Sequence, residues 1–290
     1  MKLMGYKYIK RKILDFSMIL DLYDKGLSGD LRVKGVREKQ LYSILKEIIN
    51  PGDHVIDLGA NIGYYPLIAM TLVGSTGKVY ALEPSPQNFK LLNKNIVLNS
   101  AENVIESFQI GGGSKPQKVK FYLSERSNQH TMLNEIYRFG GHQDYLLNES
   151  LEVDVVDMSS FIMDKPPIDL IRMDIEGYEV SVLQGLKSAI ESGVFKGKIV
   201  FETHWPKYSD KHNSIRKQLK MLFNNGYYPS IITSNNEEPS RLIERGYLAK
   251  RIIRTSATRK QGIYYNIKPV DAEYFICDAG GVRDVVFEKR

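Results

Sequence analysis

The chain has 290 residues, 42% of them hydrophobic and 26% charged, so it can bury a sizeable core as one large domain with an elaboration. Its single cysteine, Cys277, excludes an internal disulfide and cannot by itself form a zinc site. The apolar stretches are too short to cross a bilayer and the N-terminus lacks a signal-peptide core, so we expect a soluble, cytoplasmic protein.

The net charge of +6 is concentrated in two segments. Residues 1–12 contain five lysines and arginines and no acid, whereas residues 241–260 contain seven and a single glutamate. Two interpretations stay open: these segments are solvated faces, or they attract an anionic partner such as a membrane surface. Nothing in the sequence specifies an oligomeric state.

From residue 53 onward, short apolar runs alternate with longer helical patterns, which predicts βαβ units and a doubly wound, mostly parallel α/β sheet. The predicted strands, in chain order, are 54–59, 78–83, 103–110, 168–174, 198–203, 226–233 and 283–289. The helices predicted between them lie near 62–73, 86–98 and 178–192.

Three additions surround this α/β domain, which we place at residues 51–290. Residues 1–50 are predicted to be a basic N-terminal helical extension that ends in a helix near 36–49. A polar stretch at 124–150 could form a lid. Residues 235–282 are predicted to be an insertion between the last two strands, near a sheet edge.

A ligand-binding turn follows the first strand, where Asp57 is succeeded by Gly59, Ala60, Asn61 and Gly63. Glycines at these positions allow a tight turn and a close approach of a ligand to the backbone. A nicotinamide cofactor calls for GxGxxG with its pyrophosphate at the helix N-terminus, but here the spacing is GxxxG and an aspartate precedes it. That carboxylate would repel a pyrophosphate and suits a cationic ammonium group.

The second strand ends in Glu83, followed by Pro84, and an acid at this position can accept hydrogen bonds from both hydroxyls of a ribose. A ligand with a ribose and a positive charge is S-adenosylmethionine. The cofactor-binding residues that we predict are Asp57, Gly59, Ala60, Asn61, Gly63, Tyr64, Glu83, Pro84 and Asp174.

Four segments together resemble the FkbM family of methyltransferases: VIDLGANIGYYPLIAM, VYALEPSPQNFKLLNKNIVLN, VDVVDMSSFI and IDLIRMDIEGYEVSVLQG. The resemblance covers roughly residues 36–205. It implies the class I methyltransferase fold, with about seven strands and the last pair antiparallel, and O-methylation of a hydroxyl, often on a sugar or a polyketide. The sequence departs from the family at Arg172, where Lys is common, and in the loop at 111–113, Gly-Gly-Gly, so adenine contacts there are not carried over.

Transfer of a methyl group to a hydroxyl requires alignment of the acceptor and removal of its proton, so we expect a base at the carboxyl ends of the strands. Arg172, Asp174 and Glu176 lie at the end of the fourth strand, and Glu202 and His204 at the end of the fifth. His204 is the preferred general base, because its usual pKa is near neutrality and the family often has a histidine there. The alternative is that its imidazole only hydrogen-bonds a loop.

Asp174 and Glu176 are predicted to hold the methionine end of the cofactor or to position the acceptor, or else to cap the next helix. His130 is a weaker candidate for a second base, in the possible lid. Asp174 and Glu202 could begin a metal site, but a third ligand is not evident from the sequence, so no metal is predicted.

Rival functions have less support. A nucleic-acid methyltransferase could use the same cofactor fold, but the fourth strand is followed by DIEG and not by an N/D-P-P-Y/F motif, so no nucleic-acid partner is expected. A scaffold protein would not need Asp57 and Glu83.

The expected acceptor is a hydroxyl on a glycan or on an anionic or lipid-linked metabolite. The basic residues 241–260 are predicted to form a rim or lid over this acceptor and to make peripheral contact with an anionic membrane.

Overall fold

The computed structural model describes residues 5–133, 146–211, 213–237, 240–256 and 258–290. The strands in these ranges are β1 (Tyr8–Ile13), β2 (Phe16–Asp21), β3 (His54–Leu58), β4 (Lys78–Leu82), β5 (Ile105–Phe108), β6 (Gly111–Gly113), β7 (Gln117–Ser124), β8 (Leu146–Asp157), β9 (Leu170–Met173), β10 (Lys198–Glu202), β11 (Tyr227–Ser234), β12 (Arg251–Arg254), β13 (Lys260–Tyr265) and β14 (Val282–Lys289). The α-helices are α1 (Leu27–Lys34), α2 (Lys39–Ile48), α3 (Tyr64–Val73), α4 (Pro86–Leu98), α5 (Met158–Met163), α6 (Glu179–Gly185), α7 (Lys187–Glu191), α8 (Ile215–Asn224), α9 (Arg241–Glu244) and α10 (Pro269–Tyr274). Short turns of other helix types are η2 (Gly74–Thr76), η5 (Trp205–Lys207) and η6 (Phe275–Ala279).

The central sheet has nine strands in the order β12-β13-β11-β14-β10-β9-β3-β4-β5. Strands β5, β4, β3, β9 and β10 are mutually parallel, and β14 runs antiparallel between β10 and β11. The chain builds outward from β3 to β5 and then returns to the other side of β3 with β9. This reversal confirms the doubly wound fold with its antiparallel final strand, and it opens a crevice at the carboxyl ends of β3 and β9.

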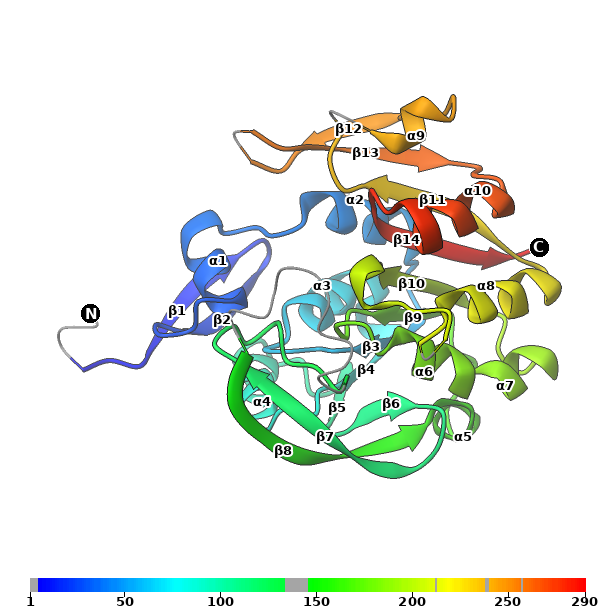
Figure 1. Ribbon diagram of the computed structural model, residues 1–290. Helices are drawn as coiled ribbons and strands as arrows, with labels where there is room; N and C mark the ends of the chain where they lie inside the picture. The colour runs from blue at the N-terminus through cyan, green and yellow to red at the C-terminus, as the bar shows by residue number, and fades with distance from the viewer. Residues whose placement is uncertain (1–4, 134–145, 212, 238–239, 257) are drawn as a thin grey trace.

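Alternate residues of the strands supply two hydrophobic cores, one on each face of the sheet. Val55 of β3 packs into the core that contains α2, α3 and α4, and its neighbour Ile56 packs into the core that contains α5, α6, α7 and α8. Figure 1 shows these helices on the two sides of the central sheet. The near-continuous apolar strands predicted from the sequence follow from this double burial. The helix predicted over 178–192 is two short helices, α6 and α7.

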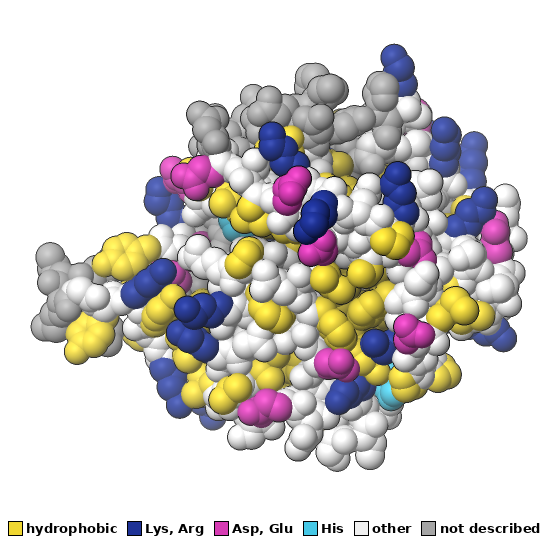
Figure 2. Space-filling view, turned by 90° about the horizontal axis from the view of Figure 1, so that it is seen from below, with side chains coloured by type: hydrophobic (Ala, Val, Ile, Leu, Met, Phe, Trp, Pro, Cys, Tyr) yellow, Lys and Arg dark blue, Asp and Glu magenta, His cyan; other side chains and the backbone are white. Residues whose placement is uncertain are grey.

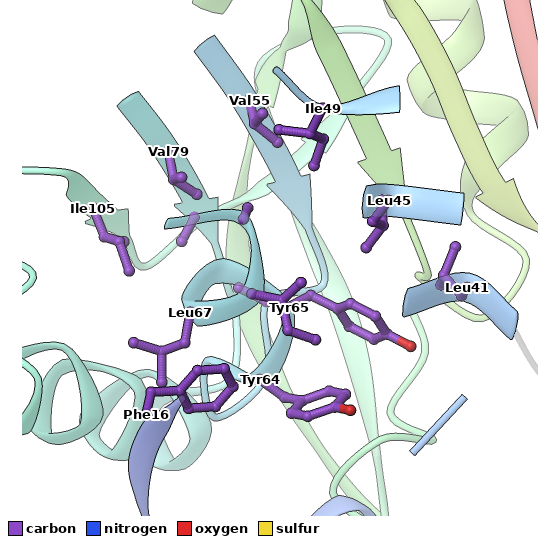
Figure 3. Close-up of a cluster of buried hydrophobic side chains, with 14 of the residues drawn as sticks. Phe16, Leu41, Leu45, Ile49, Val55, Tyr64, Tyr65, Leu67, Val79 and Ile105 are labelled. Carbon is purple, nitrogen blue, oxygen red and sulfur yellow. The ribbon is translucent and has the colours of Figure 1, made fainter. Parts of the chain in front are cut away.

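The N-terminal extension is helical only in part, because residues 8–21 form the hairpin of β1 and β2 ahead of α1 and α2. In β2, Phe16, Met18 and Leu20 alternate with more exposed residues and are almost fully buried. Phe16 meets the ring of Tyr64 in α3 edge-on, with centroids 6.4 Å apart (Figure 3). The prediction missed the hairpin because this period-two signal is short and lies among basic residues.

Gly111–Gly113 is not a loop but β6, which pairs with β8 in a second sheet of order β6-β8-β7. This sheet lies below the central sheet in the view of Figure 1. A Cβ on Gly185 of α6 would stand 2.0 Å from the carbonyl oxygen of Gly113, and one on Gly112 would stand 2.5 Å from Leu58. The glycines therefore let a strand pass directly against α6 and β3. Part of the 124–150 stretch, residues 134–145, lies outside the described residues.

The segment 235–282 extends the sheet, as an insertion between β11 and β14. Its strands β12 and β13 continue the sheet beyond β11. Within the described ranges, no helix is long and apolar enough to cross a bilayer.

Candidate active site

A cavity lies over the carboxyl ends of β3, β4 and β9, where the topology places a ligand crevice. The open space within this crevice is about 640 Å³, a figure that includes solvent at its mouth. The lining residues that the sequence predicted are Gly59, Ala60, Asn61, Glu83, Pro84, Arg172, Asp174 and Glu176. The others are Leu27, Arg37, Tyr65, Phe121, Ser127, Asn128, His130, Met132 and Ile175.

The turn after β3 can form only with glycine at position 59. Gly59 has a φ of +82°, and a Cβ there would lie 2.2 Å from the carbonyl oxygen of Asp174. Asn61 also adopts a left-handed conformation, with a φ of +50°. Its side-chain amide donates to the carbonyl of Ser127 at 2.7 Å, which ties the turn to the 124–133 segment above it. Strained residues held in this way are often part of a binding site.

Glu83 follows β4 directly and is 4% exposed as a residue. Its Oε2 accepts from the backbone N–H of Asn61 at 2.8 Å, and its Oε1 from that of Ser85 at 2.9 Å. Glu83 also has a side-chain hydrogen bond with Asn88, and a carboxylate has about four acceptor positions, which leaves room for a ribose hydroxyl. Burial raises the pKa of Glu83 to about 7, against the lowering effect of these hydrogen bonds.

Asp57 does not line the cavity but lies behind Arg172. Arg172 Nη1 donates to Asp57 Oδ1 at 3.0 Å, and its Nη2 donates to Asp174 Oδ2 at 3.0 Å. The guanidinium also stacks on the ring of Tyr65, 3.8 Å from its centroid. Burial raises the pKa of Asp57, while Arg172 opposes this shift. Asp174, which lines the cavity, is therefore better placed than Asp57 to meet an ammonium group.

Gly63 and Tyr64, two further predicted cofactor residues, lie outside the cavity lining. The Tyr64 hydroxyl accepts from the backbone N–H of Arg37 at 3.1 Å and donates to its carbonyl at 3.0 Å, so it braces the segment before α2. Its neighbour Tyr65 reaches the cavity instead, because successive residues of a helix project about 100° apart.

The acceptor-side residues converge next to Asp174. His204 Nε2 lies 3.6 Å from Glu176 Oε2 and 3.8 Å from Asp174 Oδ1, and its Nδ1 donates to Glu179 Oε1 at 3.0 Å. Glu176 pairs with Lys207 and has a φ of +55°. The structure thus brings together His204, Glu176, Asp174 and Arg172 as predicted, and adds Glu179, whose position on α6 gave no chemical signal in the sequence.

Charge in this cluster is unevenly compensated. Burial lowers the pKa of His204, but Glu179 and Glu176 outweigh it and raise this pKa to about 9. The ring therefore carries a proton at neutral pH, and must lose it before it can act as the predicted base. Burial, Asp174 and Glu38 raise the pKa of Glu202 to about 8, although Arg283 Nη2 lies 3.0 Å from its Oε2.

His130 also lines the cavity, where its Nδ1 accepts from the backbone N–H of Ser124 at 2.9 Å. Burial lowers its pKa to about 4, so the ring is neutral but a weak base. His130, the weaker candidate for a second base, reaches the cavity because the 121–132 segment folds over it.

The basic segment 241–260 supplies no lining residue of this cavity among those described. Its strand β12 is five strands from β9, or roughly 24 Å at about 4.8 Å per strand. Arg245 pairs with Asp271, and Arg251 with Glu47. The segment is therefore an edge of the sheet and does not form the rim of the described cavity.

A doubly wound sheet with an antiparallel final strand, a glycine turn after its first parallel strand and a ribose-binding acid after its second defines a class I, S-adenosylmethionine-dependent methyltransferase. The model of the Methyltransferase FkbM domain matches residues 57–229, and the chain belongs to that family. S-adenosylmethionine is its cofactor, as the sequence predicted.

Three curated relatives illustrate the match. Methyltransferase sdnD of Sordaria araneosa is 26% identical over 210 residues, which are 62% of this chain and 74% of that protein. 31-O-demethyl-FK506 methyltransferase FkbM of Streptomyces tacrolimicus is 28% identical, over 49% of this chain and 62% of its own length. Hexuronic acid methyltransferase AglP of Haloferax volcanii is 27% identical, over 60% of this chain and 65% of its own length. The match thus spans less than two thirds of the last two proteins.

Proposed function

We propose that the protein transfers the methyl group of S-adenosylmethionine to a hydroxyl of a sugar or glycan. The methyl carbon leaves the sulfonium sulfur and bonds to the acceptor oxygen, and S-adenosylhomocysteine is released. The proton of the hydroxyl passes to the cluster of Asp174, Glu176 and His204. One observation carries this proposal: the cavity runs from Glu83 to Asp174 and Glu176, and His204 stands directly beside those two carboxylates.

The cofactor fits this cavity in one direction. Its ribose belongs at Glu83, whose two oxygens are already fixed by backbone N–H groups. Its ammonium belongs near Asp174, because Asp57 is covered by Arg172. The sulfonium then lies between these ends, and the acceptor enters from the side of Glu176 and His204, where the charged groups can align a hydroxyl.

An acidic glycan is the favoured acceptor. Arg37 lines the cavity; its Nε donates to Glu38 Oε1 at 2.9 Å and its Nη1 lies 3.9 Å from Asp30 Oδ2, and we assign its Nη2 to an acceptor carboxylate or phosphate. The name of the relative AglP specifies hexuronic acid, and that of FkbM specifies an O-demethyl substrate. We place the protein in the cytoplasm and further propose that the basic segment 241–260 contacts an anionic membrane, where lipid-linked glycans are found.

A nucleic-acid acceptor is the alternative. It would favour a broad basic surface near the cavity. On the described part of the face in Figure 2, basic side chains are scattered among acidic and apolar ones. The described part of this face therefore offers no broad basic surface in support of a nucleic-acid acceptor.

The test is incubation of the purified chain with methyl-labelled S-adenosylmethionine and separate pools of neutral glycans, uronate-containing glycans, lipid-linked glycans and RNA. We expect label in a glycan fraction, in a product that withstands mild alkali, because a methyl ether is stable there and a methyl ester is not. Label that mild alkali releases, or label confined to RNA, would contradict the proposal.

A further inference from the structure

Three potential metal ligands meet at the carboxyl ends of β9 and β10. One ligand atom from each of Asp174, Glu202 and His204 lies within 4.8 Å of the other two. From the sequence, Asp174 and Glu202 were already candidates for two metal ligands, and no metal was predicted because a third ligand was not evident. The chain supplies this ligand as it leaves β10, where His204 turns back toward Asp174.

The imidazole is held as a metal-binding histidine is held. Its Nδ1–H donates to Glu179, which is fully buried and accepts from the backbone N–H of Ile175 at 3.2 Å and of Gly177 at 3.3 Å. Its Nε2, on a side chain 10% exposed, makes no hydrogen bond to any described residue and faces the carboxylates. A carboxylate that fixes the distal ring nitrogen is the usual outer partner of a metal-bound histidine.

The two carboxylates have oxygens to spare. Asp174 uses Oδ2 for Arg172, and Glu202 uses Oε2 for Arg283. Among the described residues, the second oxygen of each makes no hydrogen bond. Arg172 is also shared with Asp57, and Glu179 has no described lysine or arginine partner. A cation bound here would take the place of the proton on His204 Nε2, because a histidine ligand must be deprotonated.

We propose that Asp174, Glu202 and His204 bind one divalent cation of the Mg²⁺ and Mn²⁺ class. Two carboxylates suit these hard cations, and Mn²⁺ also accepts an imidazole. Three protein ligands leave positions for water and for the acceptor's hydroxyl oxygen, since Asp174 lines the cofactor cavity. With Nε2 bound to the cation, Glu176 is the member of the cluster that takes the hydroxyl proton. The contact with an acceptor rests on the proposed function, but the cation site itself does not.

The test is titration of Mn²⁺ into protein that has been treated with chelator and dialysed. Binding is measured by electron paramagnetic resonance, as the loss of the six-line signal of free Mn²⁺. We expect one ion per chain. Glu202→Gln keeps the shape of the side chain and leaves Arg283 its contact with Glu38. His204→Asn keeps a donor for Glu179 and removes Nε2. Each should weaken Mn²⁺ binding at least about tenfold, whereas Glu106→Gln, on the exposed side of β5, should not.

Two results would overturn the cation site: no Mn²⁺ bound by the folded wild-type chain at millimolar concentration, or equal binding by wild type, Glu202→Gln and His204→Asn. Cofactor binding and glycan methylation, both measured in the presence of chelator, test the proposed function separately from the cation site. A chain that methylates a glycan in chelator but binds no Mn²⁺ refutes only the cation. A chain that binds Mn²⁺ through these residues but labels no glycan refutes only the acceptor.

Discussion

The two ends of the cavity are built in different ways. At the cofactor end, Glu83 is fixed by backbone N–H groups of Asn61 and Ser85, which belong to short segments after β3 and β4. At the acceptor end, side chains from β9, the turn after it, α6 and the exit of β10 meet in one charged cluster. The first end depends on local backbone geometry, and the second depends on the packing of distant segments.

Arg172 bridges Asp57 of β3 and Asp174 at the acceptor end, so its removal should have the largest effect on stability. Arg172→Met leaves Asp57 buried without a partner, which should cost about 3–5 kcal/mol of unfolding free energy. Arg172→Lys keeps the charge, and should cost less than half as much. Denaturant unfolding measures both variants. A Met variant as stable as wild type would show that the buried pair of Asp57 and Arg172 does not stabilise the fold.

The acceptor end should control turnover without controlling cofactor affinity. His204→Asn retains a donor for Glu179 but loses Nε2, so we expect kcat to fall by about 10² or more because the group acts on the acceptor. Affinity for S-adenosylmethionine should stay within about twofold by calorimetry. Unchanged turnover, under conditions where chemistry limits the rate, would return His204 to a structural role.

The cofactor end should respond to pH through Glu83. Its pKa is raised to about 7, so the carboxylate is fully formed only above that pH. Affinity for S-adenosylmethionine should therefore weaken by up to about tenfold as the pH falls from 8 to 6. Glu83→Gln should lose this dependence, and comparison with it subtracts the titration of the cofactor's own amine. The same pH profile in both proteins would exclude Glu83 as the cause.

The smallest effect on the chemistry is expected from the basic sheet edge. Lys250→Glu together with Arg254→Glu reverses two exposed charges and spares Arg251, which holds Glu47. Cofactor affinity should stay the same, and association with anionic vesicles should weaken by about 1 kcal/mol or more per charge at low salt. Vesicle sedimentation measures this. Unchanged association would make the segment a solvated face.

The same contrast explains what the sequence could predict. The residues of the cofactor turn lie next in sequence to the strands that position them: Asp57, Gly59 and Asn61 after β3, and Glu83 after β4. The spacing of glycines and acids after these strands therefore predicted the turn and the ribose-binding glutamate. This spacing could not show that Arg172 covers Asp57, since this contact joins β3 to β9.

The covering segments were harder to predict. His130 and Met132 reach the cavity through β7 and the hairpin-like return of Thr131 to Tyr122, which leaves no periodic signal. Glu179 looks like an ordinary first-turn helix residue until the fold places His204 beside it. Side-chain clusters of this kind depend on long-range packing, and position in the sequence alone does not encode them.

The most direct test of the account is calorimetric titration of S-adenosylmethionine into wild type, Glu83→Ala and Glu106→Ala. Glu83 follows β4 and lines the cavity, whereas Glu106 lies in the neighbouring strand β5 and is exposed. We predict one cofactor per wild-type chain, a loss of about 1–3 kcal/mol for Glu83→Ala, and no change for Glu106→Ala. Absence of binding to the folded wild-type chain, or equal binding by all three proteins, would contradict the assignment of this cavity to the cofactor.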